Sequence, residues 1–144
     1  ASMTRTTWSF PNPVHFTTQL EVRIGDINYG GHLGNDKVLS LAQEARVQML
    51  RSMGYSELDV EGPGIIMTEA EIKYVKEAFA GDILTVDLHV GNFSAVGCSI
   101  YYNIRIIDKV IAVVRTGIVF YDYNSRKVVR VPSVFQQRFN DNLA

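Results

Sequence analysis

The chain has 144 residues, 47% hydrophobic and 20% charged, which is the composition of one globular domain spanning residues 1–144. Fourteen basic and fifteen acidic residues leave a formal net charge of -1 without a long run of like charges, so we expect no nucleic-acid partner. The single cysteine, Cys98, excludes an internal disulfide and favours a cytoplasmic location. The polar N-terminus predicts neither a signal peptide nor a membrane span.

Apolar and polar residues alternate from Phe16 to Ile24, which predicts a strand with one buried face. From Asp36 to Met53 the apolar residues instead recur at helical spacing. Asn35 is the expected N-cap of this helix, and Gly54 stands where a C-terminal glycine belongs. The apolar arc of the helix is wide, so we expect a sheet to curl around it.

Four strand-like segments follow the helix, with a hairpin turn expected at Asp108-Lys109, and a short terminal helix is expected at 132–139. The order of strand, long helix and four strands in a meander predicts an α+β domain. In it, one long central helix packs against an antiparallel sheet of about five strands. The four segments after the helix are 65–76, 83–90, 100–106 and 110–121.

One helix covers a face of such a sheet but leaves the edges of the sheet open. Because open edges pair readily with another chain, we expect a homodimer or a dimer of dimers. A monomer whose edges are protected by charged residues is the alternative.

The segment from Gly25 to Asn35 interrupts every periodicity with glycine and polar residues. Glycines let the backbone approach a ligand closely, and amide groups at a helix N-terminus stabilise a developing oxyanion. His32 could act beside them as an acid, a base or a hydrogen-bond donor. The alternative is an ordinary glycine-rich turn in which His32 packs against the helix.

This segment resembles the motif Asp-x-Asp-x-x-Gly-His-Val-x-Asn of the hotdog-fold thioesterases in the 4-hydroxybenzoyl-CoA thioesterase superfamily. The resemblance extends from Phe16 to Pro132. It implies a hotdog fold and the hydrolysis of an acyl-CoA or acyl-carrier thioester to a carboxylic acid and a thiol. In register, the matching residues are Asp26, Gly31, His32 and Asn35, and Glu44-Ala45-Arg46, Gly81-Asp82 and Val131-Pro132 are also similar.

The sequence departs from the family pattern at Asn28, where many members have a catalytic aspartate. An amide is neither a nucleophile nor a useful base near neutral pH. The plant acyl-carrier thioesterases have an asparagine two residues before the histidine, but that position here is Gly30. Neither mechanism therefore transfers directly, and we expect slow turnover.

Two carboxylates remain as candidates for the missing group. Asp26 could act as general base on a water or brace the loop, and we favour bracing because turn aspartates commonly accept local N–H groups. Glu44 corresponds to the helix carboxylate that the related Arthrobacter-type enzymes use. Its alternative is an exposed helix residue near Arg46 and Lys37.

The other roles follow from the chemistry of the segment. Asn28 could position water or the thioester carbonyl, and His32 would orient the acyl group or polarise the carbonyl. The backbone amides from Gly31 to Asn35 would form the oxyanion site. The substrate-binding candidates are Tyr29, Gly31, Leu33, Gly34 and Asn35.

Two rival functions share the same fold. Gly25 to Asn28 is similar to the start of the R-specific enoyl-CoA hydratase motif, although the proline of that motif is absent and His32 comes one residue late. A non-catalytic acyl-thioester-binding protein is the other rival. His15, His89 and Cys98 lack metal-ligand spacing and no phosphate-binding glycine motif occurs, so we expect neither a metal nor a cofactor.

Overall fold

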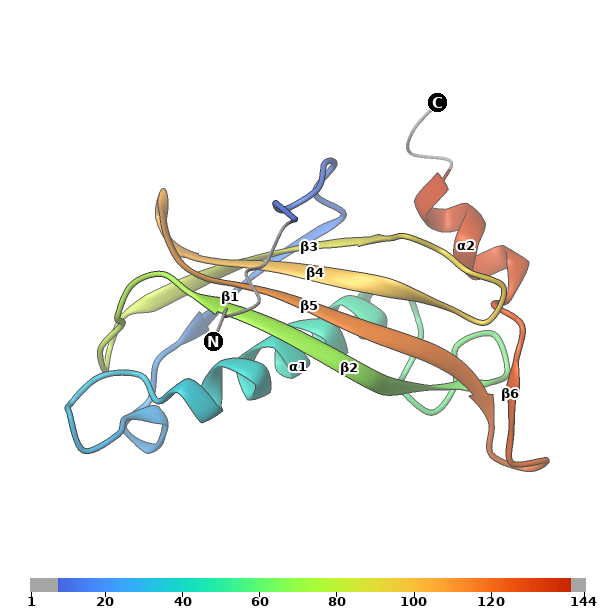
Figure 1. The fold of residues 1–144 in the computed structure, drawn as a ribbon, viewed down its shortest axis with the longest axis horizontal. Coiled ribbons are helices and arrows are strands. Elements are labelled where there is room, and N and C mark those ends of the chain that lie inside the picture. The colour runs from blue at the N-terminus through green and yellow to red at the C-terminus, as the bar shows by residue number, and fades with distance from the viewer. Residues whose placement is uncertain (1–7, 141–144) are drawn as a thin grey trace, which may run out of the picture.

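A computed structural model describes residues 8–140, in which an antiparallel sheet curves around one long helix (Figure 1). The strands lie in the order β1-β3-β4-β5-β2, and a short β6 pairs with β5. The elements are β1 (Phe16–Glu21), the 3-10 turn η1 (Ile24–Asp26), α1 (Asn35–Ser52), β2 (Gly64–Tyr74), β3 (Ile83–Gly91), β4 (Gly97–Ile106), β5 (Lys109–Asp122), β6 (Lys127–Val129) and α2 (Ser133–Asn140).

The predicted α+β architecture is confirmed, with β6 as one additional strand. The predicted meander is wrong for β2, which pairs with β5 rather than with β3. Helix α1 carries the chain from β1 at one edge of the sheet to β2 at the other edge, as Figure 1 shows. The meander is therefore limited to β3, β4 and β5. A register shift between Met67 and Glu69 accounts for the imperfect alternation of β2.

The first strand is shorter than predicted because the chain turns away after Glu21. The Asp26 carboxylate accepts a hydrogen bond from the Arg23 amide at 2.9 Å, and η1 begins at Ile24. Such local side-chain bonds compete with a strand ladder. Ile24 is 85% exposed, so its predicted place on the buried face of the strand is wrong.

Helix α1 begins one residue earlier than predicted. Gly34 is the N-cap, in an extended conformation with φ -69° and ψ 140°, and Asn35 is already helical. The assignment of Asn35 as N-cap is therefore wrong. At the other end Gly54 has φ +86°, the left-handed conformation that favours glycine after a helix, as predicted.

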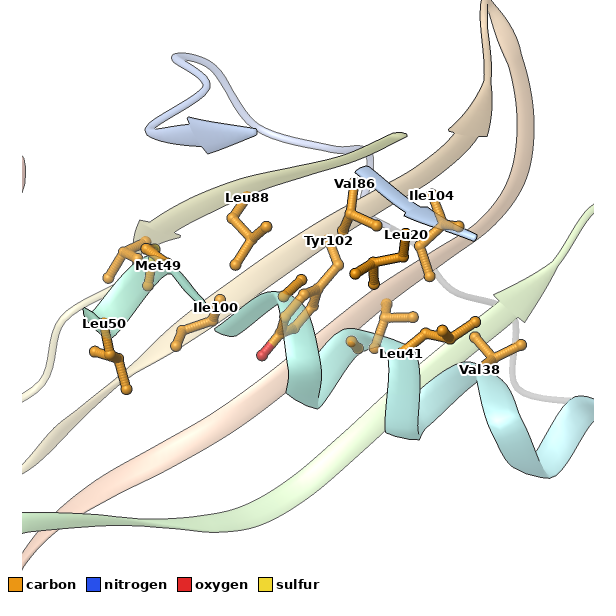
Figure 2. Close-up of a cluster of buried hydrophobic side chains, with 14 of the residues drawn as sticks. Leu20, Val38, Leu41, Met49, Leu50, Val86, Leu88, Ile100, Tyr102 and Ile104 are labelled. Atoms are coloured by element: carbon orange, nitrogen blue, oxygen red, sulfur yellow. The ribbon is translucent and has the colours of Figure 1, made fainter. Parts of the chain in front are cut away.

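The core lies between α1 and the concave face of the sheet. Val38, Leu41, Met49 and Leu50 project from the helix toward strand residues that Figure 2 shows opposite them. Each fully buried aliphatic side chain contributes about 1.5–3 kcal/mol. The strand residues labelled in Figure 2 are Leu20, Val86, Leu88, Ile100, Tyr102 and Ile104.

Arg46 is part of this core, with only 4% of its surface exposed. Its guanidinium donates to Glu57 at 2.9 Å and to the Tyr102 hydroxyl at 2.8 Å, and that hydroxyl pairs with Thr116 at 2.8 Å. A buried guanidinium is tolerated when its donors are paired in this way. Arg46 therefore pairs with Glu57, whereas the carboxylate of Glu44 lies beside Arg23.

Candidate active site

A cavity of about 280 Å³ lies beside the N-terminus of α1. The loop before the helix and the end of β2 supply its polar groups, whereas Val38, Ile111 and Ala112 supply apolar surface. A small cavity with apolar walls and a few polar groups is the usual form of a small-molecule site. It is lined by Asn28, His32, Leu33, Asn35, Val38, Tyr74, Val75, Lys76, Glu77, Ala78, Ile111 and Ala112.

The loop that carries Asn28 and His32 is closed on itself by hydrogen bonds. The Asn28 amide donates to the His32 carbonyl at 2.9 Å, and the Gly30 amide donates to Asn28 Oδ1 at 2.9 Å. Gly31 has φ +84°, a backbone conformation that residues other than glycine rarely adopt. The Asn28 side-chain oxygen therefore accepts a hydrogen bond within the loop, and its NH₂ group remains as the donor for a ligand.

His32 lies at the cavity opposite Glu77. Its Nε2 atom is 3.6 Å from Glu77 Oε1, and its ring packs edge-on against Phe79 with the ring centroids 6.2 Å apart. The two side chains are 31% and 63% exposed, so water reaches both. The structure thus places an imidazole and a carboxylate together, and the carboxylate is not one that the motif suggests.

The N-terminus of α1 forms another border of the cavity, through Asn35. The first amides of a helix lack intrahelical acceptors and lie at the positive end of the helix dipole. The Tyr74 hydroxyl donates to the Asn35 carbonyl at 2.9 Å and so ties the first turn of the helix to β2. This end of the helix can stabilise negative charge that develops on a bound ligand.

Asp26, Tyr29 and Gly34 line a neighbouring hollow that shares Asn28 with the cavity. The Asp26 carboxylate accepts from the Arg23 amide, and the Asp26 carbonyl accepts from the Gly34 amide at 2.9 Å. The Tyr29 side chain is fully exposed. Asp26 therefore contacts the backbone of the loop on both sides rather than the cavity.

Glu44 lines neither the cavity nor the hollow. Its carboxylate lies 3.6 Å from the Arg23 guanidinium, on a half-exposed part of α1. Gly31 likewise lines neither space. Of the predicted residues, the structure brings Asn28, His32, Leu33 and Asn35 to the cavity.

The second wall of the cavity, formed by residues 74–78 and by Ile111 and Ala112, is not predicted by the sequence motif. The available signal was the end of the strand pattern at Lys76, shortly before Gly81-Asp82. That signal marks a loop but does not indicate that this loop lies beside the start of the helix. The pairing of β2 with β5 decides this, and it joins segments far apart in the sequence.

Other reactive groups lie elsewhere. Burial raises the pKa of the Cys98 thiol to about 12, so this thiol is not a nucleophile near neutral pH. Among residues 8–140, no group of three or more histidine, cysteine or acidic side chains could hold a metal ion. In the same range, no helix has the length and apolar character needed to cross a membrane.

A family model described as the thioesterase-like superfamily matches residues 22–139, and the chain belongs to this superfamily. The match contains α1, the loop before it and both walls of the cavity. No curated protein sequence matches the chain.

Solved structures of thioesterases share the hotdog fold. The 1,4-dihydroxy-2-naphthoyl-CoA thioesterase Slr0204 from Synechocystis has a TM-score of 0.79 at 24% identity, covering 90% of this chain and 98% of that one. The DHNA-CoA thioesterase of Staphylococcus aureus has a TM-score of 0.77 at 17% identity, covering 88% and 89%. A hypothetical protein from Aquifex aeolicus has a TM-score of 0.78 at 21% identity, covering 86% and 98%.

Proposed function

We propose that the protein hydrolyses a thioester of CoA or of an acyl carrier to a free carboxylic acid and a thiol. The observation that carries the proposal is the cavity in which His32 and Asn28 lie beside the N-terminus of α1. The apolar wall formed by Val38, Ile111 and Ala112 suits an acyl group. Two of the similar structures are named as thioesterases of aromatic acyl-CoA substrates, so aromatic acyl groups belong in the test.

The roles follow from the positions of these groups. The Asn28 NH₂ group can donate a hydrogen bond to the thioester carbonyl, and His32 orients the reacting groups at the cavity. The amides at the start of α1 stabilise the oxyanion of the tetrahedral intermediate. Asp26 braces the loop, since its carboxylate and carbonyl both accept backbone hydrogen bonds. Glu44 lies outside this set.

We propose further that two copies of the chain pair along β2. This strand is an edge of the sheet, and six of the eleven residues of Gly64–Tyr74 are exposed, among them the apolar side chains of Met67 and Tyr74. Long open edges are usually protected or paired. A partner seated there would lie close to Tyr74 and would therefore narrow the opening of the cavity.

The test is thiol release from a panel of acyl-CoA esters with aliphatic chains of several lengths and with aromatic acyl groups. We expect hydrolysis of at least one member above background. His32→Ala should lower kcat by about 100-fold, as loss of one positioned acid, base or donor usually does. Glu21→Gln, an exposed position on β1, is the matched control and should keep wild-type activity.

Two other outcomes would reverse the proposal. If crotonyl-CoA loses its enoyl absorbance without thiol release, the protein is a hydratase. If acyl-CoA esters bind and none is converted, it is a thioester-binding protein. An activity unchanged in His32→Ala would contradict the site even if the reaction stands.

A further inference from the structure

The backbone around Glu77 is fixed on both sides. Ile104 pairs with Ala112 and Arg105 pairs with Val110, which leaves Ile111 as the extra residue of a β-bulge. The Ile111 carbonyl accepts hydrogen bonds from the Val75 amide at 2.8 Å and the Lys76 amide at 3.1 Å. Bulges next to functional sites commonly redirect neighbouring groups. This one holds the residues that immediately precede Glu77.

The residues after Glu77 are held by the histidine loop. The Ala78 carbonyl accepts a hydrogen bond from the Leu33 amide at 2.6 Å, and Ala78 is fully buried. Phe79 forms a bridge with His32, and its amide donates to the Asp82 carboxylate at 2.8 Å. The side chain of Glu77 is therefore exposed, while contacts with both walls of the cavity hold its backbone in place.

The contacts of the carboxylate leave one oxygen available. Glu77 Oε1 lies 3.6 Å from His32 Nε2. Among the described residues, no hydrogen bond or ion pair engages the other oxygen, Oε2. Asp26 and Glu44, by contrast, have their partners at Arg23 and outside the cavity. Glu77 is the one carboxylate in the cavity lining within residues 8–140.

We propose that Glu77 is the catalytic general base of this protein and supplies from the β2–β3 connection the carboxylate that Asn28 does not provide. The inference rests on the proposed thioester hydrolysis. His32 donates through Nε2 to Oε1 and fixes the orientation of the carboxylate, and Oε2 accepts a proton from water. Catalytic hydrogen bonds are often long without substrate and shorten in the complex, which fits the 3.6 Å separation.

The step balances without any further reactant. As Oε2 takes the proton, the water oxygen forms a bond to the carbonyl carbon, and the carbonyl electron pair moves to oxygen beside the start of α1. Collapse of this intermediate breaks the C–S bond and expels the thiolate. The proton on Glu77 then passes to sulfur, which leaves a carboxylic acid, a thiol and the ionised base.

The experiment compares Glu77→Gln with the wild type on the best substrate of the panel. We expect kcat to fall by about 100- to 10,000-fold, the range for a general base, with KM changed less than threefold. Glu77→Asp should restore part of the activity. Sodium formate should partly rescue Glu77→Ala, because a small carboxylate can occupy the vacated space, and a merely structural glutamate would not be rescued. Glu21→Gln again serves as the control.

The outcomes separate this inference from the function it rests on. If the wild type releases thiol and Glu77→Gln retains at least a third of its kcat, the base assignment is overturned and the hydrolase stands. If Glu44→Gln loses as much activity as Glu77→Gln, and if formate does not rescue Glu77→Ala, the helix carboxylate is the base instead. If no substrate is hydrolysed by the wild type, both proposals fail. Unchanged circular dichroism spectra establish that the variants are folded.

Discussion

Single residues decide the chemistry of this site, and Asn28 is the clearest case. It stands at the second aspartate position of the motif that this loop resembles, and its Oδ1 accepts a hydrogen bond from the Gly30 amide. The position of its neighbours His32, Leu33 and Asn35 at one cavity could be predicted, because one short loop carries them all to the helix start. Glu77 could not be predicted, because its place depends on a bulge at Ile111.

His15 is a second residue whose surroundings have a measurable consequence. Its ring stacks on His89 with centroids 4.6 Å apart, and its Nδ1 accepts the Val90 amide at 3.0 Å. Phe139 of α2 packs edge-on against it. Burial, and secondly the charge of His89, lower the pKa of His15 to about 4.

Because the folded pKa of His15 is below its unfolded value of 6.5, the unfolded chain binds a proton first as the solution is acidified. The free energy of unfolding should therefore fall between pH 6.5 and 4, by up to about 3 kcal/mol from this group. Urea unfolding of the wild type and His15→Gln across this range isolates the contribution. An identical pH dependence of the two proteins would contradict the assignment.

At the scale of elements, periodicity predicted the strands and helices well and their ends less well. Strand β1 ends at Glu21, earlier than predicted, because local hydrogen bonds compete with the strand ladder. Helix α1 starts at Asn35, one residue earlier than predicted, because Gly34 is its N-cap. The hairpin between β4 and β5 turns at Ile107-Asp108, so the turn predicted at Asp108-Lys109 is one residue late. Residue type misleads there, because isoleucine is rare in such turns.

Ile107 has φ +56° and is 79% exposed. A β-branched residue in the left-handed region costs about 1–3 kcal/mol, and glycine adopts that conformation without this cost. Ile107→Gly should therefore raise the free energy of unfolding by about 1 kcal/mol after the entropy of the more flexible unfolded chain is subtracted. Lys109→Gly, in the adjoining strand, should lower it. Chemical denaturation measures the free energy of unfolding of both variants. A lower value for Ile107→Gly than for the wild type would contradict the proposal that Ile107 is strained.

For the whole molecule, the open edge along β2 predicts a dimer. Met67 and Tyr74 are 42% and 46% exposed beside that edge. Light scattering after size exclusion should give twice the mass of one 16.2 kDa chain. Met67→Lys should shift the protein toward the monomer, because a charge placed in a strand-edge interface opposes pairing. Ile24→Lys changes an exposed residue away from β2 and should leave the dimer intact. A monomeric wild type would rule out this arrangement.

Our central proposal is that the protein hydrolyses thioesters in the cavity beside the start of α1. The most direct measurement is the rate of thiol release from the acyl-CoA panel, with wild type and His32→Ala assayed side by side near neutral pH. We expect the wild type to release thiol from at least one aliphatic or aromatic substrate, and the variant to lose about 100-fold in rate. Wild-type release at the background rate on every substrate, or equal release by the two proteins, would contradict it.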